Sequence, residues 1–100
     1  MMLGTIRKQP ADVLDYDIDF SEWLPETDEI QGIDVAITRI DDVEMGVDDL
    51  NAKYIINNNP AVKLWLDKGV DGESYKIETT ITTKDGRTKQ VELRARLRDV

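Results

Sequence analysis

The sequence contains neither cysteine nor histidine. Without cysteine the chain can form no disulfide, and it has no thiol that could act as a nucleophile. Without histidine it lacks the most common general base of enzymes and the most common ligand of transition metals. It also lacks the motifs of a nucleophile elbow, a phosphate-binding loop, a dinucleotide-binding loop or a zinc site. We therefore predict that the protein is not an enzyme and that it has no catalytic residues, cofactor or metal.

Positive charge is scarce. The chain carries 13 lysine and arginine residues against 21 aspartate and glutamate residues, which gives a formal net charge of −8 at pH 7. Because phosphate binding needs clustered positive charge, we expect neither nucleic acid nor an anionic membrane surface as a partner. Residues 1–8 contain no long apolar run, so the sequence predicts neither a secretory signal nor a transmembrane segment there.

Length and hydrophobic content are those of one small folded domain. The chain has 100 residues, of which 40% are hydrophobic, and a chain of this size buries roughly two-thirds of its unfolded surface. Residues 1–12 show no clear hydrophobic period. We interpret them as an extended N-terminal arm that is mobile alone and becomes ordered on a neighbouring protein. The domain itself is expected to span residues 13–100.

The clearest pattern lies in residues 73–100, where apolar and polar residues alternate on both sides of Lys84-Asp85-Gly86. Two such runs with a turn between them predict a β-hairpin. A two-residue turn would place Ile81 opposite Gln90, whereas a three-residue loop places Ile77 opposite Leu93 and keeps the apolar faces together. We therefore predict the three-residue loop, with Gly86 in the left-handed conformation of a β-bulge.

Further strands are predicted over residues 15–20, 33–38, 54–56 and 61–66, with acidic or turn-forming segments between them. A short helical turn fits residues 47–50, but no segment has a helical period of ordinary helix length. The pattern predicts an all-β fold: a single antiparallel, immunoglobulin-like β-sandwich of about six or seven strands with an extended N-terminal arm.

Asp15, Asp17 and Asp19 share one face of the first strand that alternates clearly. Their spacing is similar to that of calcium ligands, but a calcium-binding loop wraps around its ion and needs glycine at its sixth position, where this chain has Phe20. Other carboxylates are plentiful, yet none forms an isolated pair in an apolar setting of the kind that glycoside hydrolysis uses. We interpret the three aspartates as a face that is solvated or paired with arginine.

The residues that we expect to contact partner proteins are apolar or basic residues of the arm, both tryptophans and a basic stripe on the last strand. These interface candidates are Leu3, Ile6, Arg7, Lys8, Trp23, Trp65, Arg94, Arg96 and Arg98. Tryptophan is enriched at binding hot spots, and Trp65 alternates with apolar neighbours, which favours an outward orientation. The arginine stripe is either a solvated face or one that meets an acidic strand. We predict that it lies near residues 15–19 of the same chain or of a neighbouring subunit.

Several segments, taken together, resemble a known family of small tailed-bacteriophage virion proteins, the fibre–tail adaptor proteins. The resemblance covers residues 3–97 and is carried by Leu14-Asp15-Tyr16-Asp17-Ile18-Asp19-Phe20, Trp23-Leu24, Val62-Lys63-Leu64-Trp65-Leu66, Gly69, Gly72, Tyr75 and Ile81-Thr82-Thr83-Lys84-Asp85-Gly86-Arg87. These motifs are structural, and none is catalytic. Residues 41–52 and 57–60 have no counterpart in the pattern.

This resemblance implies an immunoglobulin-like domain that is assembled in several copies at the neck or tail of a virion. The expected function is that of a structural adaptor, which bridges the tail or head–tail connector to fibres or neighbouring ring proteins by protein–protein contacts. Such a protein is made in the host cytoplasm and forms a homo-oligomeric ring in the particle. The alternative is a carbohydrate-binding β-sandwich on a virion or cell surface, with Trp23 and Trp65 as a sugar-stacking platform.

Overall fold

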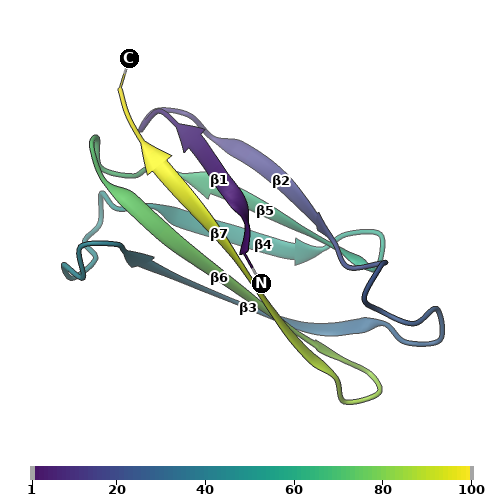
Figure 1. Cartoon of the computed structure of the whole chain (residues 1–100). Helices are drawn as coiled ribbons and strands as arrows, with labels where there is room; N and C mark the ends of the chain where they lie inside the picture. The colour runs from purple at the N-terminus through teal and green to yellow at the C-terminus, as the bar shows by residue number, and fades with distance from the viewer. Residues whose placement is uncertain (1, 100) are drawn as a thin grey trace.

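Seven strands form two facing sheets in the computed structural model, which describes residues 2–99 (Figure 1). The strands are β1 (Met2–Lys8), β2 (Leu14–Asp19), β3 (Ile30–Arg39), β4 (Asn51–Ile56), β5 (Ala61–Asp67), β6 (Ser74–Thr83) and β7 (Thr88–Leu97). One sheet has the order β1-β7-β6-β3, and the other has the order β2-β5-β4. The predicted all-β sandwich is confirmed. Among residues 2–99 no helix could span a membrane.

The core lies between the two sheets and is formed by the inward half of each alternating strand. In β5, Val62, Leu64 and Leu66 are fully buried, whereas Trp65 between them is 42% exposed. From the facing sheet, Ile77 and Ile81 of β6 are also fully buried. Two sheets whose apolar faces interdigitate in this way form the standard core of a sandwich. The outer face of each sheet therefore lies outside the core and can carry charged or polar side chains.

The β6–β7 hairpin has the predicted register. Ile77 lies opposite Leu93, and Tyr75 lies opposite Ala95. The loop is closed by the amide of Thr83, which donates to the carbonyl of Arg87 at 2.9 Å. Gly86 has φ of 91°, in the left-handed region that favours a residue without Cβ. The three-residue loop is therefore confirmed.

A buried carboxylate fixes the tip of this hairpin. Asp28, in the connection between β2 and β3, accepts hydrogen bonds from the Arg87 guanidinium at 2.7 Å and from the backbone amides of Glu29 and Asp85 at 2.9 and 3.0 Å. Burial alone would raise the pKa of Asp28, but these bonds, together with one from Thr83, outweigh burial and lower the pKa to about 2. The carboxylate therefore stays charged and holds the loop in place.

A second polar network ties the acidic segment between β3 and β4 to the core. The buried hydroxyl of Tyr75 donates to Asp49, which also accepts the backbone amide of Gly46 at 2.7 Å. Burial raises the pKa of Tyr75, and the bond to Asp49 raises it further. Arg39 adds ion pairs to Asp41 at 2.9 Å and to Asp49 at 3.6 Å. The predicted helical turn at residues 47–50 is only a hydrogen-bonded turn.

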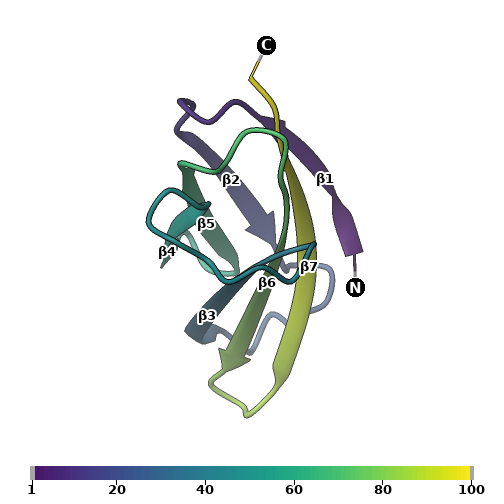
Figure 2. The same ribbon diagram turned by 90° about the vertical axis from the view of Figure 1, so that its left-hand side faces the viewer.

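Strand β1 differs from the arm that we expected. Residues 2–8 pair with β7 in parallel, from Gly4 beside Leu93 to Lys8 beside Leu97, and Figures 1 and 2 both show the two strands side by side. The segment is extended, as predicted, but it completes an edge of its own chain's sheet. The physical reason is that β7 would otherwise leave its backbone donors and acceptors without partners along that edge. The β1–β7 pair is also a parallel exception in the expected antiparallel sandwich.

Candidate interaction surfaces

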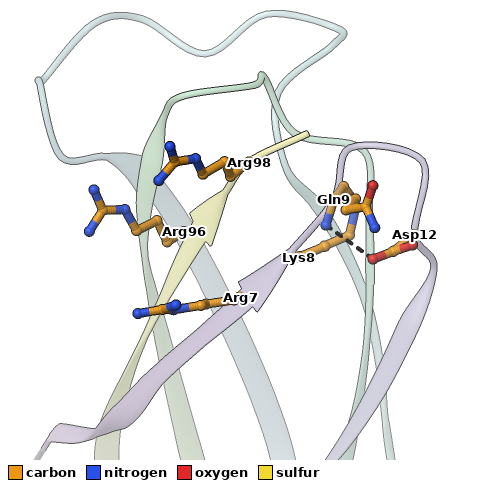
Figure 3. Close-up of a pocket in the computed structure, with 6 residues that line it drawn as sticks. All are labelled: Arg7, Lys8, Gln9, Asp12, Arg96 and Arg98. Atoms are coloured by element: carbon orange, nitrogen blue, oxygen red, sulfur yellow. Dashed lines mark hydrogen bonds between the residues drawn. The ribbon is translucent and has the colours of Figure 1, made fainter. Parts of the chain in front are cut away.

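The pairing of β1 with β7 gathers arginines on the outer face of the four-stranded sheet. Arg7 lies directly beside Arg96 in the parallel register. Arg94 and Arg98 stand two residues to either side of Arg96, and alternate residues of a strand share a face. Figure 3 shows the side chains of Arg7, Arg96 and Arg98 projecting to the same side of the two strands. We call these four residues, Arg7, Arg94, Arg96 and Arg98, the arginine surface.

Within residues 2–99 most of this positive charge has no ion-pair partner. Arg94 pairs with Glu92 at 3.0 Å, but among residues 2–99 the other three arginines form no ion pair. Arg7, Arg96 and Arg98 line a cavity of about 320 Å³ together with Lys8, Gln9 and Asp12. The Asp12 carboxylate accepts the amide of Gln9 at 3.0 Å. Like charges directly opposite each other weaken a sheet, so anionic groups of a partner would stabilise this arrangement.

The outer face of the three-stranded sheet carries the opposite charge. Asp15, Asp17 and Asp19 point outward from β2, while Ile18 between them is buried. On β5, Trp65 lies beside Asp15 and Lys63 lies beside Asp17. The Lys63 ammonium is 3.4 Å from Asp15 and 3.9 Å from Asp17, and Lys53 of β4 lies beside Trp65 on the same face, so two lysines offset part of the charge of the three aspartates. We call Asp15, Asp17, Asp19 and Trp65 the acidic surface.

The predicted meeting of arginines and aspartates within one chain is wrong. β2 pairs with β5 in the three-stranded sheet, whereas the arginine stripe lies on β7 in the other sheet. The two groups therefore occupy opposite outer faces of the sandwich. The first strand does meet the last, as expected for such folds, but that first strand is β1 and not the acidic one. A meeting between chains stays a prediction.

The remaining interface candidates differ in accessibility. Lys8 is buried, and its ammonium donates to the backbone carbonyls of Gln9 and Lys68 at 2.9 and 2.6 Å. Burial lowers the pKa of Lys8, and the nearby carboxylates of Asp12 and Asp67 oppose that shift. Ile6 packs partly against the core, whereas Leu3 is 44% exposed. Lys8 is therefore a structural anchor for the end of β1 and is not available to a partner.

The two tryptophans do not form a common platform. Trp23 packs partly against the core, with the Lys89 ammonium 5.8 Å from the centre of its ring. Trp65 stands on the outer face of the three-stranded sheet. Ile55 of β4, 61% exposed, lies opposite Lys63 on the same face and adds an apolar contact that the sequence analysis missed. A surface in which one exposed tryptophan is flanked by charged residues is typical of a protein-binding site.

These features define a structural class of protein: a small β-sandwich with oppositely charged outer faces, whose residues 2–99 contain no cluster of metal-ligating side chains. Over residues 8–96 the chain matches the family described as podophage GP4 fiber-tail adaptor protein gp77. The chain belongs to this family of phage fibre–tail adaptor proteins, which confirms the resemblance seen in the sequence. A search of curated proteins found no match. The matched region includes β2 to β6 and almost all of β7, but only the last residue of β1.

Proposed function

We propose that this protein is a structural adaptor that bridges the tail or head–tail connector of a podophage to its fibres or to neighbouring ring proteins. The observation that carries the proposal is the family match over residues 8–96. The protein would act by binding alone, as a homo-oligomeric ring in the particle, after synthesis in the host cytoplasm. The net charge of −8 supports contacts with proteins and not with nucleic acid.

A bridge needs at least two contact surfaces that do not compete for the same space. The sandwich supplies two for neighbouring ring proteins, because the arginine surface and the acidic surface stand on opposite outer faces, and the loops at its two ends remain for tail and fibre proteins. The buried core and the Asp28 and Asp49 networks hold the two faces in a fixed relation. A rigid module loses little conformational freedom on binding, so it can join two partners at a defined spacing.

The test is whether the chain is part of purified particles. Particles of the encoding phage should contain the protein in several copies, retained after washing in high salt and quantified by mass spectrometry against the portal protein. In a phage that lacks the protein, tails should form without their fibres. Complete, fibre-bearing particles without this chain would overturn the proposal. A glycan titration of the purified protein that changes its tryptophan fluorescence would instead favour the carbohydrate-binding alternative.

A further inference from the structure

We propose that the arginine surface of one copy binds the acidic surface of the next copy, so that the ring interface joins the outer faces of two different sheets. This inference rests on the adaptor function proposed above and specifies how copies of the chain meet. Its starting point is that Arg7, Arg96 and Arg98 have no acidic partner among residues 2–99, although the chain has a net charge of −8. The occupant to which the geometry points is a second copy of the chain.

The two rows of charge match in spacing. Arg94 and Arg96 are alternate residues of β7 and Arg98 directly follows that strand, while Asp15, Asp17 and Asp19 are alternate residues of β2. Alternate residues of any strand repeat at about 6.6–6.8 Å, so Arg96 and Arg98 can pair with Asp15 and Asp17 of the next copy. Arginine and carboxylate groups form two parallel hydrogen bonds when they meet in one plane, which rewards this pairing over a looser contact. The backbone amide of Arg98, just beyond β7, still donates to the carbonyl of Lys8 at 3.0 Å. Both rows therefore have a fixed backbone, and little conformational freedom is lost on binding.

Trp65 gives the contact an apolar centre. It lies beside Asp15 and is 42% exposed. An arginine guanidinium stacks well on an indole face, because the ring presents its negative face to the cation. Arg7 stands one strand to the side of the β7 row, as Trp65 stands one strand to the side of the β2 row. The contact would therefore pair the charged residues of β7 with those of β2. One strand to the side, it would stack Arg7 on Trp65.

The position of the two surfaces determines the kind of assembly. They lie on different outer faces, so the contact is head-to-tail and leaves one free surface of each kind at the two ends of the growing assembly. Contacts of this kind close into rings when the rotation between copies allows it and otherwise continue as filaments. A symmetric dimer would instead bury like charges against each other. The proposal therefore explains how one small chain can form a multi-copy ring without a second interface.

Other acidic segments of a neighbouring copy are weaker candidates for the same surface. In the connection between β3 and β4, Asp41 and Asp49 are already paired with Arg39. Asp28, in the connection between β2 and β3, is paired with Arg87. Glu44 and Asp48 are exposed but lie on a loop without the strand repeat. They provide a control with the same change of charge.

The test is a charge-reversal exchange measured by sedimentation velocity. One variant, R96E/R98E, reverses the charge of two residues of the arginine surface, and a second, D15K/D17K, reverses the charge of two residues of the acidic surface. Thermal melting first shows that both are folded, as expected for exposed side chains. The measurement uses about 0.1–0.15 M salt, where the Debye length of roughly 8–10 Å screens the overall repulsion between acidic chains but not pairs in contact. E44K/D48K is the matched control for D15K/D17K.

The wild-type chain and the control should associate in a concentration-dependent way. Each reversed variant alone should associate at least tenfold more weakly, because the two central charge pairs of the contact then repel each other. An equimolar mixture of the two variants should recover association, since each face again meets its opposite. The proposal is overturned if the wild type stays monomeric, if either reversed variant associates like the wild type, if the mixture does not recover, or if the control loses association.

Particle composition separates this result from the adaptor function. If the reversed variants enter virions at the wild-type copy number, the interface is wrong although the adaptor function stands. If the wild-type chain is absent from virions, the adaptor function fails whatever the protein does in solution. Both the adaptor function and the interface are supported by a third result. In that result virions contain the wild type, exclude each reversed variant when it is supplied alone, and accept the two variants together.

Discussion

Removing residues 2–7 tests whether β1 is a part of the folded domain or an arm attached to it. This deletion leaves Lys8, where the family match begins, and removes the edge strand that carries Arg7. The backbone hydrogen bonds to β7 are worth about 0.5–1.5 kcal/mol each. Ordering each residue of the strand costs about 1–2 kcal/mol, so these two contributions nearly cancel.

The remaining contribution is the apolar contact of Ile6 with the core. Full burial of such a side chain is worth about 1.5–3 kcal/mol, and Ile6 is only partly buried. We therefore expect the deletion to lower the free energy of unfolding by about 1–2 kcal/mol, which for a domain of this size lowers Tm by roughly 4–16 °C. Because the core residues of β5 to β7 are untouched, the truncated chain should still unfold in one cooperative transition.

The assay is thermal unfolding followed by circular dichroism, combined with hydrogen exchange of the full chain. Amides of β1 should exchange before those of β6, since β1 is an edge strand with little buried apolar surface. Leu3→Ser, at a position that is 44% exposed, serves as the control and should change stability by less than about 0.5 kcal/mol. A loss above about 4 kcal/mol would place β1 in the essential core. No loss at all would show that β1 does not dock on its own chain.

Three further predictions concern the interior. Gly86→Val should destabilise the protein by about 1 kcal/mol or more in urea unfolding, because φ is 91° at this position. The control Gly46→Val, at a glycine whose φ is not positive, should cost less stability. Equal losses in the two variants would contradict this. Tyr75→Phe removes the hydroxyl that donates to Asp49 and accepts the amide of Val70, so it should cost about 1–3 kcal/mol; a cost below about 0.5 kcal/mol would contradict the network. The pKa of Asp28 is lowered from 3.8 to about 2, so its contribution to the free energy of unfolding is complete above about pH 4 and is lost as pH falls towards 2. Asp28→Asn should therefore flatten the decline of stability between about pH 4 and pH 2. An unchanged dependence of stability on pH in this variant would refute the prediction.

The hairpin and the sandwich could be predicted from the sequence because their information is local. Alternation in residues 73–100 fixes which side chains face the core, and the position of Gly86 fixes the loop length. A slip by one residue would turn either Ile77 or Leu93 towards solvent, so only one register is compatible with the pattern. The outward orientation of Trp65 follows from the same alternation.

The arrangement of the charged surfaces depends on pairings that no local pattern encodes. Nothing in residues 2–8 identifies β7 as their neighbour, because the inward positions carry Gly4, Ile6 and Lys8, of which only Ile6 is a large apolar residue. The pairing of Arg7 with Arg96 was therefore missed, although both residues were interface candidates. In the same way, alternation shows that Asp15 and Asp17 face outward but not to which sheet their strand belongs. The sequence identified most of the candidate residues, and the topology determines which of them share a surface.

The most direct test of the proposed function is an electron-microscopy reconstruction of the intact phage particle that resolves the junction between tail and fibres. We expect several copies of this sandwich in a closed ring, with Arg96 and Arg98 of each copy facing Asp15 and Asp17 of the next, and with tail and fibre proteins on either side of the ring. A junction in which tail and fibres meet without this chain would contradict the adaptor function and, with it, the ring.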